Sequence, residues 1–213
     1  MRANQRLIAD DGKEVMLFPL EYMYISQGEG GSYSHAGTLN IDFLGYGANG
    51  RIYNCPYYAP CSCRCVAIYA ASDNGRVFES LDNVHLADGS LQKVTFVTMH
   101  DDNPIASVGS TFTQGDLIGH TGTTGPGVSG DHLHFNTAYG TYDGFIQVSS
   151  GQYELKNSSH IYDTCYVNDT TLVEDYGYTW KTYTGGNTYM IKKGKFPFVL
   201  YARKIRENLT FNM

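Results

Sequence analysis

The residues best suited to chemistry lie at the end of the segment 114–135, QGDLIGHTGTTGPGVSGDHLHF. A strand-like run leads into a glycine-rich turn, which is followed by His132 and His134. Because side chains alternate along a β-strand, these two histidines should face the same side of a sheet. Their backbones would lie about 6.5–7 Å apart, at about 3.3 Å of rise per residue. This spacing suits one metal ligand beside one acid–base group.

Three more polar residues could join this pair. His35 and Asp42 lie at the two ends of a segment that joins a glycine-rich loop to a short strand, and His100 ends an apolar strand. Taken alone, each histidine is more often a surface residue or a hydrogen-bonded core residue than a ligand. If the segments converge, two histidines and an aspartate would form a ligand set suited to Zn²⁺ with one position left open.

The cysteines offer a rival metal site. An odd number of cysteines without an export signal argues against a disulfide framework. Three alternate along a strand and would share one face, whereas structural zinc sites favour cysteines two to four residues apart on turns. A buried row of core side chains is therefore the favoured interpretation. A cysteine peptidase would need a thiolate beside an imidazole, and the sequence singles out no cysteine for that role. The five cysteines are Cys55, Cys61, Cys63, Cys65 and Cys165.

Composition favours an all-β protein. The chain has 213 residues, 24 of them glycine and 18 tyrosine, so it combines turn-forming and strand-forming side chains in a length sufficient for a sizeable core. Asn74-Gly75 and Asp88-Gly89 separate apolar runs and predict hairpin turns. We expect a compact antiparallel sheet or barrel-sandwich core whose glycine-rich loops surround a groove.

Two regions follow from this pattern. Residues 1–150 should form the domain that carries the site, and residues 151–213 a C-terminal β extension packed on the same domain. Smaller elements are also predicted, namely strands at 105–108 and 161–167 and a hairpin over 188–206 that turns at Lys193-Gly194.

Charge and hydropathy exclude several function classes. The net charge of −6 argues against non-specific nucleic-acid binding. The glycine-rich turn lacks the Gly-Lys-Ser/Thr of a phosphate loop, which argues against nucleotide binding. The sequence has no run of 18 apolar residues, so we expect no membrane span. The first 18 residues lack the apolar centre of a signal peptide, so we expect synthesis in the cytosol without a signal peptide.

Basic side chains gather near the C-terminus. From residue 181 onward the chain has seven basic residues and one acidic residue, a local charge of +6, which leaves −12 for residues 1–180. This asymmetry could mark a docking segment for an anionic partner or a solvated hairpin. The basic residues are Lys181, Lys192, Lys193, Lys195, Arg203, Lys204 and Arg206.

The segment 115–135, GDLIGHTGTTGPGVSGDHLHF, strongly resembles the signature of lysostaphin/LytM-type zinc endopeptidases. Members of this family are peptidoglycan hydrolases with a compact antiparallel β-fold. Upstream, Ala59-Pro60 opens the run that stands where the family has its A-P-x-x-G-x-V strand. The run VTFVTMH, residues 94–100, stands where the family has the strand ending in a catalytic histidine. The resemblance covers roughly residues 20–136.

The resemblance assigns a role to each polar residue. It implies that His35, Asp42 and His134 bind one Zn²⁺ and that His100 and His132 form the catalytic pair, without deciding which is the general base. The usual H-x3-D spacing of the first two ligands is replaced here by H-x6-D, because Leu39 stands at the fourth position after His35. A longer loop of this kind resembles that of some phage tail and phage lysin members.

The resemblance implies a function. The chain would be a zinc-dependent endopeptidase that hydrolyses peptide stems or cross-bridges of bacterial peptidoglycan, encoded by a phage. It would act as part of the virion tail or as a lysin released from the host cytoplasm to the cell wall. The alternative is a structural or binding module of a phage tail tip with no activity or incidental activity. The basic C-terminus could bind anionic wall polymer or other phage tail proteins.

Overall fold

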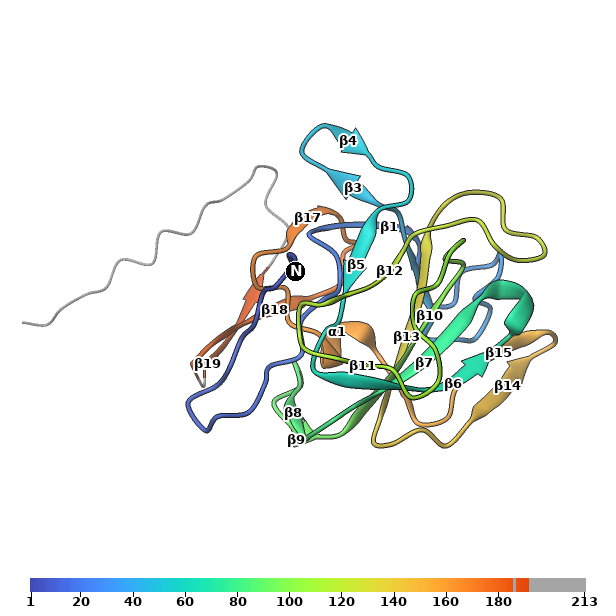
Figure 1. Cartoon of the computed structure of the whole chain (residues 1–213). Coiled ribbons are helices and arrows are strands. Elements are labelled where there is room, and N and C mark those ends of the chain that lie inside the picture. The colour runs from blue at the N-terminus through green and yellow to red at the C-terminus, as the bar shows by residue number, and fades with distance from the viewer. Residues whose placement is uncertain (186, 192–213) are drawn as a thin grey trace, which may run out of the picture.

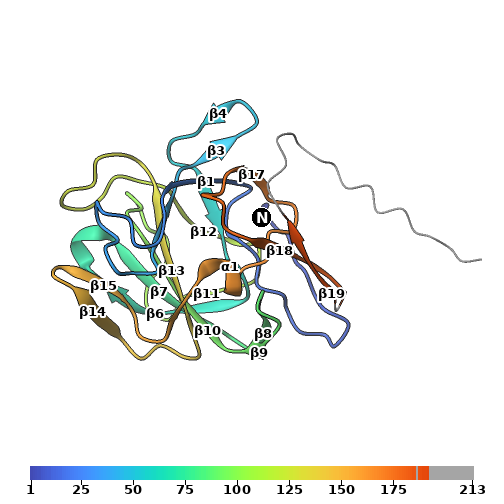
Figure 2. The ribbon, with the colours of Figure 1, turned by 180° about the vertical axis from the view of Figure 1, so that it is seen from behind.

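The expected all-β class is confirmed, because strands account for 43% of the described residues and helices for 4%. The computed structural model describes residues 1–185 and 187–191. Figure 1 and Figure 2 show a β-rich body from which the β3–β4 hairpin projects, with the β14–β15 and β18–β19 hairpins on opposite sides. None of the helices in these residues is long and apolar enough to span a membrane.

One sheet of nine strands forms the body. From edge to edge its strands are β11 (Thr111–Phe112), β6 (Cys63–Tyr69), β7 (Gly75–Ser80), β10 (Val94–Met99), β13 (Leu133–Tyr139), β2 (Ile41–Phe43), β1 (Tyr22–Gln27) and β17 (Thr171–Glu174), while β16 (Ser158–Ser159) pairs with β13. All pairings in this sheet are antiparallel except β1 with β17. The sheet is therefore mixed and open, not a closed barrel.

Short two-stranded pairs and two single-turn helices complete the described fold. The pairs are β12 (Leu117–His120) with β5 (Pro56–Tyr58), β14 (Phe145–Ser149) with β15 (Gln152–Leu155), β18 (Trp180–Thr184) with β19 (Asn187–Ile191), β3 (Tyr46–Gly47) with β4 (Gly50–Arg51), and β8 (Val84–His85) with β9 (Leu91–Gln92). The helices are the 3-10 turn η1 (Ala71–Asp73) and α1 (Ile161–Thr164).

The strand predicted at 161–167 is wrong, because α1 begins this segment. Ile161 and Thr164 are both buried, and a helical turn places residues three apart on the same face. The predicted strand at 105–108 is also wrong: Ser110 N–H donates to Ser107 O in a turn, and Gly109 takes a φ of +95°. The turn predicted at 193–194 lies outside the described residues.

The main hydrophobic core covers one face of the sheet. It includes Phe96 and Phe135 from neighbouring strands together with Cys61, Cys63 and Cys65. These three cysteines have no exposed surface, and burial raises the pKa of each thiol. The predicted row of core cysteines is thereby confirmed, and neutral buried thiols suit neither a metal site nor a nucleophile.

Part of the chain after residue 150 enters this same core. Ile161, Cys165 and Trp180 pack in the cluster that contains Phe135, and α1 contacts both β13 and β18. The division of the chain at residue 150 stays a prediction.

The opposite face of the sheet is only partly covered. There Leu155 of the β14–β15 hairpin packs on Val77, Val97 and Ala138 of the sheet. Phe145 of the same hairpin stacks on Tyr69 with ring centroids 3.5 Å apart. Strands β10, β13 and β2 continue beyond this hairpin and carry polar side chains on the same face. The candidate site therefore lies on the face opposite the main core.

Candidate metal and catalytic site

Strand register brings Asp42 and His134 together. The two residues are direct partners on the antiparallel strands β2 and β13. Their neighbours Phe43 and Leu133 enter the main core, so alternation turns Asp42 and His134 to the other face. The His134 Nδ1 atom lies 3.0 Å from Asp42 Oδ1. A pair separated by 92 positions in sequence is thus fixed by sheet pairing.

His35 reaches the pair from the glycine-rich loop before β2. The loop is folded by hydrogen bonds from His35 N–H to Gly31 O and from Thr38 N–H to His35 O, each 2.9 Å long. The fully buried His35 ring places Nε2 3.3 Å from Asp42 Oδ1 and 3.3 Å from His134 Nδ1. The seven-residue step from His35 to Asp42 therefore accommodates a turn and still converges on one point.

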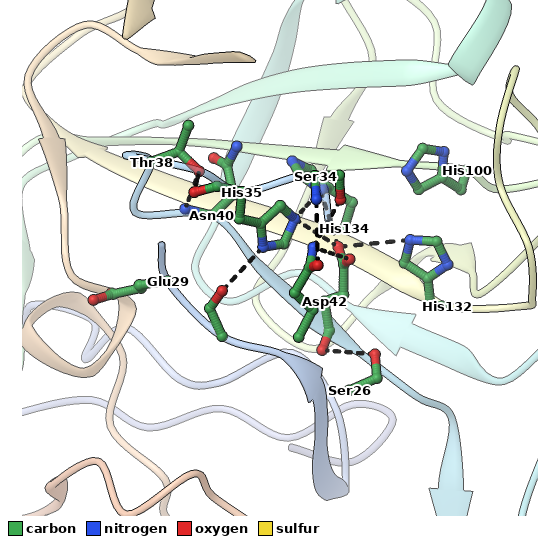
Figure 3. A network of polar contacts seen from close by, with 12 residues as sticks. Ser26, Glu29, Ser34, His35, Thr38, Asn40, Asp42, His100, His132 and His134 are labelled. Atoms are coloured by element: carbon green, nitrogen blue, oxygen red, sulfur yellow. Dashed lines mark hydrogen bonds and ion pairs between the residues drawn. The ribbon is translucent and has the colours of Figure 1, made fainter. Parts of the chain in front are cut away.

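The three donor atoms fit Zn²⁺. With zinc–ligand bonds of about 2.0–2.1 Å, ligand atoms at the corners of a tetrahedron are about 3.3–3.4 Å apart. The three separations here are 3.0, 3.3 and 3.3 Å, and Figure 3 shows the three side chains pointing at one another. Two imidazole nitrogens and one carboxylate oxygen also match the donor types of a catalytic zinc site with an open position.

The pKa values of Asp42 and His134 also suit metal binding. Burial raises the pKa of Asp42, but hydrogen bonds and charge interactions with His134 and His35 outweigh burial and hold it well below its usual range. Burial lowers the pKa of His134. The aspartate is therefore ionised and His134 neutral near pH 7, which are the states that metal ligation requires. Gln27 adds a contact from its amide nitrogen to Asp42 Oδ2, at 3.3 Å.

His100 and His132 lie side by side next to the cluster. Figure 3 shows both rings on the side of Asp42 and His134 away from His35. Their ring centroids are 4.6 Å apart, and the His132 Nε2 atom lies 3.6 Å from Asp42 Oδ1. The structure thus brings all five predicted residues into one constellation, and their roles remain predictions.

Backbone carbonyls select the tautomer of both rings. His100 Nδ1 lies 2.8 Å from Thr124 O, and His132 Nδ1 lies 2.7 Å from Gly130 O. A carbonyl can only accept, so each Nδ1 carries the proton and each neutral ring keeps a lone pair on Nε2. Burial also lowers the pKa of both rings. Near pH 7 each can therefore accept a proton at Nε2.

His100 adopts an unusual backbone conformation. Its φ of +79° lies in the left-handed region, which is costly for a residue with a side chain. Its N–H donates to Asp73 O over 2.8 Å, and its C=O accepts from Thr124 N–H over 3.1 Å. These bonds hold the strained turn that aims the ring from the end of β10 toward His132.

The site opens into a groove of about 820 Å³. Aromatic side chains line its walls, and two of them, Tyr33 and Tyr53, are 74% and 71% exposed. The glycine-rich turn at 126–130 forms another part of the wall with little side-chain bulk. An extended peptide could lie in such a groove.

Sequence inspection did not find the supporting role of Asp131. This buried carboxylate accepts hydrogen bonds from Thr121 Oγ1 over 2.6 Å and from Asn54 N–H over 2.9 Å, and it pairs with Arg51 of β4. The ring of His132 donates instead to Gly130 O and that of His100 to Thr124 O, while carboxylates of Asp42 and Asp73 lie 3.6 and 3.9 Å from the two rings. Asp131 instead joins the β3–β4 hairpin to the turn before His132, a link that no local sequence pattern reveals.

A comparison with known proteins finds a curated relative from a phage. The chain is 38% identical over 173 residues to morphogenesis protein 1 of Bacillus phage B103, an alignment that covers 80% of this chain. The chain spans only 45% of the length of that relative. No known protein-family profile matches the sequence.

Several solved structures are similar to this chain at low identity. A zinc-containing peptidase from Vibrio cholerae is 18% identical with a TM-score of 0.40, over 63% of this chain and 43% of that chain. The catalytic domain of lysostaphin from Staphylococcus simulans is 22% identical with a TM-score of 0.38, over 63% and 85%. The catalytic domain of the prophage-encoded M23 protein EnpA from Enterococcus faecalis is 15% identical with a TM-score of 0.40, over 56% and 82%.

Removing the carboxylate of Asp131 should destabilise the protein. We expect Asp131→Ala to lower the free energy of unfolding by about 3 kcal/mol, because buried donors around it lose a charged acceptor. The control is Asp143→Ala, which breaks an exposed ion pair with Lys156 and should cost under about 1 kcal/mol. Urea unfolding of both variants measures the difference, and equal losses would contradict the role given to Asp131.

Proposed function

We propose that the chain belongs to the lysostaphin/LytM-type zinc endopeptidases and cleaves peptide stems or cross-bridges of bacterial peptidoglycan. The observation that carries this proposal is the convergence of His35, Asp42 and His134 at zinc-ligand spacing beside two tautomer-fixed histidines. The signature over residues 115–135 gives independent support from the sequence.

The three proposed zinc ligands are positioned by different parts of the fold. Asp42 and His134 are fixed by sheet register, while His35 approaches from a loop. One Zn²⁺, when bound, would polarise a carbonyl group and make a water molecule more acidic. Asp42 would supply the negative charge of the ligand set, and the imidazoles of His35 and His134 would each supply a lone pair.

His132 and His100 would move the proton. In the neutral state each ring presents an unprotonated Nε2, so either can take a proton from the attacking water as general base. The resulting imidazolium keeps its Nδ1–H bond to a carbonyl and can donate the new proton to the leaving amine. The second ring, 4.6 Å away between centroids, would take a proton from solvent at Nε2 and, as an imidazolium, donate a hydrogen bond to the charge that develops on the substrate oxygen.

Substitution of single histidines tests these roles. We expect His134→Ala to lose bound zinc and the ability to clear a cell-wall suspension. His100→Ala and His132→Ala should keep zinc but lose about 10²–10⁴-fold in activity, because each removes a proton-transfer group. Zinc content by elemental analysis and wall clearing by turbidity measure both effects.

His85→Ala is the matched control, since His85 pairs with Asp11 and not with the groove residues. It should change neither zinc content nor activity. Full activity and zinc content in His134→Ala would show that the ligand assignment is wrong.

A structural module of a phage tail tip is the second candidate. Its support is the curated relative, which is named a morphogenesis protein and comes from a phage. Both candidates place the protein in a phage context, either in the virion tail or released from the host cytoplasm as a lysin.

The two locations predict different distributions. If the chain is a tail component, mass spectrometry should detect it in particles purified by density gradient at a fixed ratio to a known tail protein. Treating the particles with high salt is the control for loosely adsorbed protein. Detection in the lysate alone would favour the free lysin.

The basic C-terminus is proposed to bind anionic wall polymer or another tail protein. We expect replacement of Lys192, Lys193 and Lys195 by Gln to weaken binding to walls, because each lysine lost removes a favourable charge interaction. Cleavage of a soluble peptide should not change. Walls stripped of anionic polymer serve as the control, and equal binding of both proteins to intact walls would argue against this role.

A further inference from the structure

A peptide group in the His35 loop is held from two sides. The carbonyl of Gly28 accepts a hydrogen bond from His35 Nδ1 over 3.2 Å. The N–H of the same peptide group belongs to Glu29 and donates to the hydroxyl of Tyr178 over 3.0 Å. The hydroxyl of Tyr178 and the imidazole of His35 thus form hydrogen bonds with opposite ends of one planar peptide group.

Other residues of the C-terminal part of the chain stabilise this contact between Tyr178 and the peptide group. His160 Nδ1 donates to Glu29 Oε2 over 2.8 Å, and Tyr162 stacks on His160 with centroids 4.7 Å apart. Tyr162 also packs on Tyr178, at 5.2 Å. Three side chains beyond residue 150 therefore pack against and support the loop that carries His35.

Only glycine fits at position 28. A Cβ atom there would lie 2.5 Å from the Tyr178 hydroxyl and 3.0 Å from a ring carbon of Tyr176. The close approach of the tyrosine to the loop backbone depends on this absent side chain.

We propose that Tyr178 is a positioning residue that fixes the tautomer and orientation of His35. While Gly28 O is held in place, it accepts from Nδ1 of His35, and Nε2 faces Asp42 and His134. Without the Tyr178 acceptor, the Glu29 N–H loses its partner and the peptide group can turn. The ring can then carry its proton on Nε2, where it blocks ligation.

This inference rests on the proposed metal role of His35. It adds that the metal site depends on residues after 150, far beyond the segment that carries the sequence signature. The other end of the loop is held separately, by Glu154 Oε2 on Leu39 N–H at 2.7 Å and by Tyr153 O on the Asn40 amide at 3.0 Å. At the Gly28–Glu29 peptide group itself, Gly28 O also accepts from Gly31 N–H over 3.2 Å. The Tyr178 contact is therefore the one from the C-terminal part of the chain that holds this peptide group against the His35 ring.

The test is Tyr178→Phe, which removes a single oxygen atom. We expect zinc affinity, measured by competition with a chromogenic chelator, to fall about tenfold, as is typical when a residue orienting a ligand is lost. Long-range ¹H–¹⁵N NMR spectra of the metal-free protein should show His35 protonated on Nδ1 in the original protein and a mixture of tautomers in the variant. The control is Tyr162→Phe, which makes the same chemical change in a ring that packs on Tyr178.

His160→Ala removes the hydrogen bond to the Glu29 carboxylate, which helps to hold the same peptide group. It should weaken zinc binding by a smaller factor. Unchanged zinc affinity and an unchanged His35 tautomer in Tyr178→Phe would overturn the inference. If the original protein bound no zinc but Tyr178→Phe still altered the tautomer, the metal proposal would fail and the positioning role of Tyr178 would stand.

Discussion

The site depends on the pairing of β2 with β13. Because Asp42 and His134 are direct partners in this pairing, their separation is set by the strand spacing and not by side-chain flexibility. A slip of one residue in either strand would turn its polar side chain, Asp42 or His134, into the main core and bring Phe43 or Leu133 to the groove. The apolar neighbours that fill the core therefore also specify which polar side chains reach the site, so stability and site geometry share the same residues.

Polar groups buried at the site are satisfied largely by the backbone. The carbonyls of Gly28, Thr124 and Gly130 each accept from the Nδ1 atom of one imidazole. This leaves Nε2 of His35, His100 and His132 for the site. Only His134 differs, because it turns Nδ1 toward Asp42. Loop conformation thus determines ring chemistry, which explains why several glycines and a strained His100 occur around the groove.

Much of this could be predicted from the sequence, and the limits have physical causes. Alternation and turn residues identified most long strands of the sheet, and residue order together with the signature identified the five polar positions. The strand predicted at 161–167 failed because a short apolar run cannot distinguish one helical turn from a strand. The roles of Asp131 and Tyr178 were missed because they arise from contacts between distant segments, and isolated aspartates and tyrosines carry no local pattern.

The H-x6-D spacing of His35 and Asp42 shows that a longer separation in sequence need not place two ligand atoms farther apart in space. Between His35 and Asp42 the chain makes a turn closed by the Thr38 N–H bond to His35 O, so three additional residues do not lengthen the path between the ligand atoms. What the longer loop does add is backbone that must be held. Glu154 and Tyr153 hold one end, and Tyr178 holds the other. The longer ligand loop therefore depends on the C-terminal residues that pack against it.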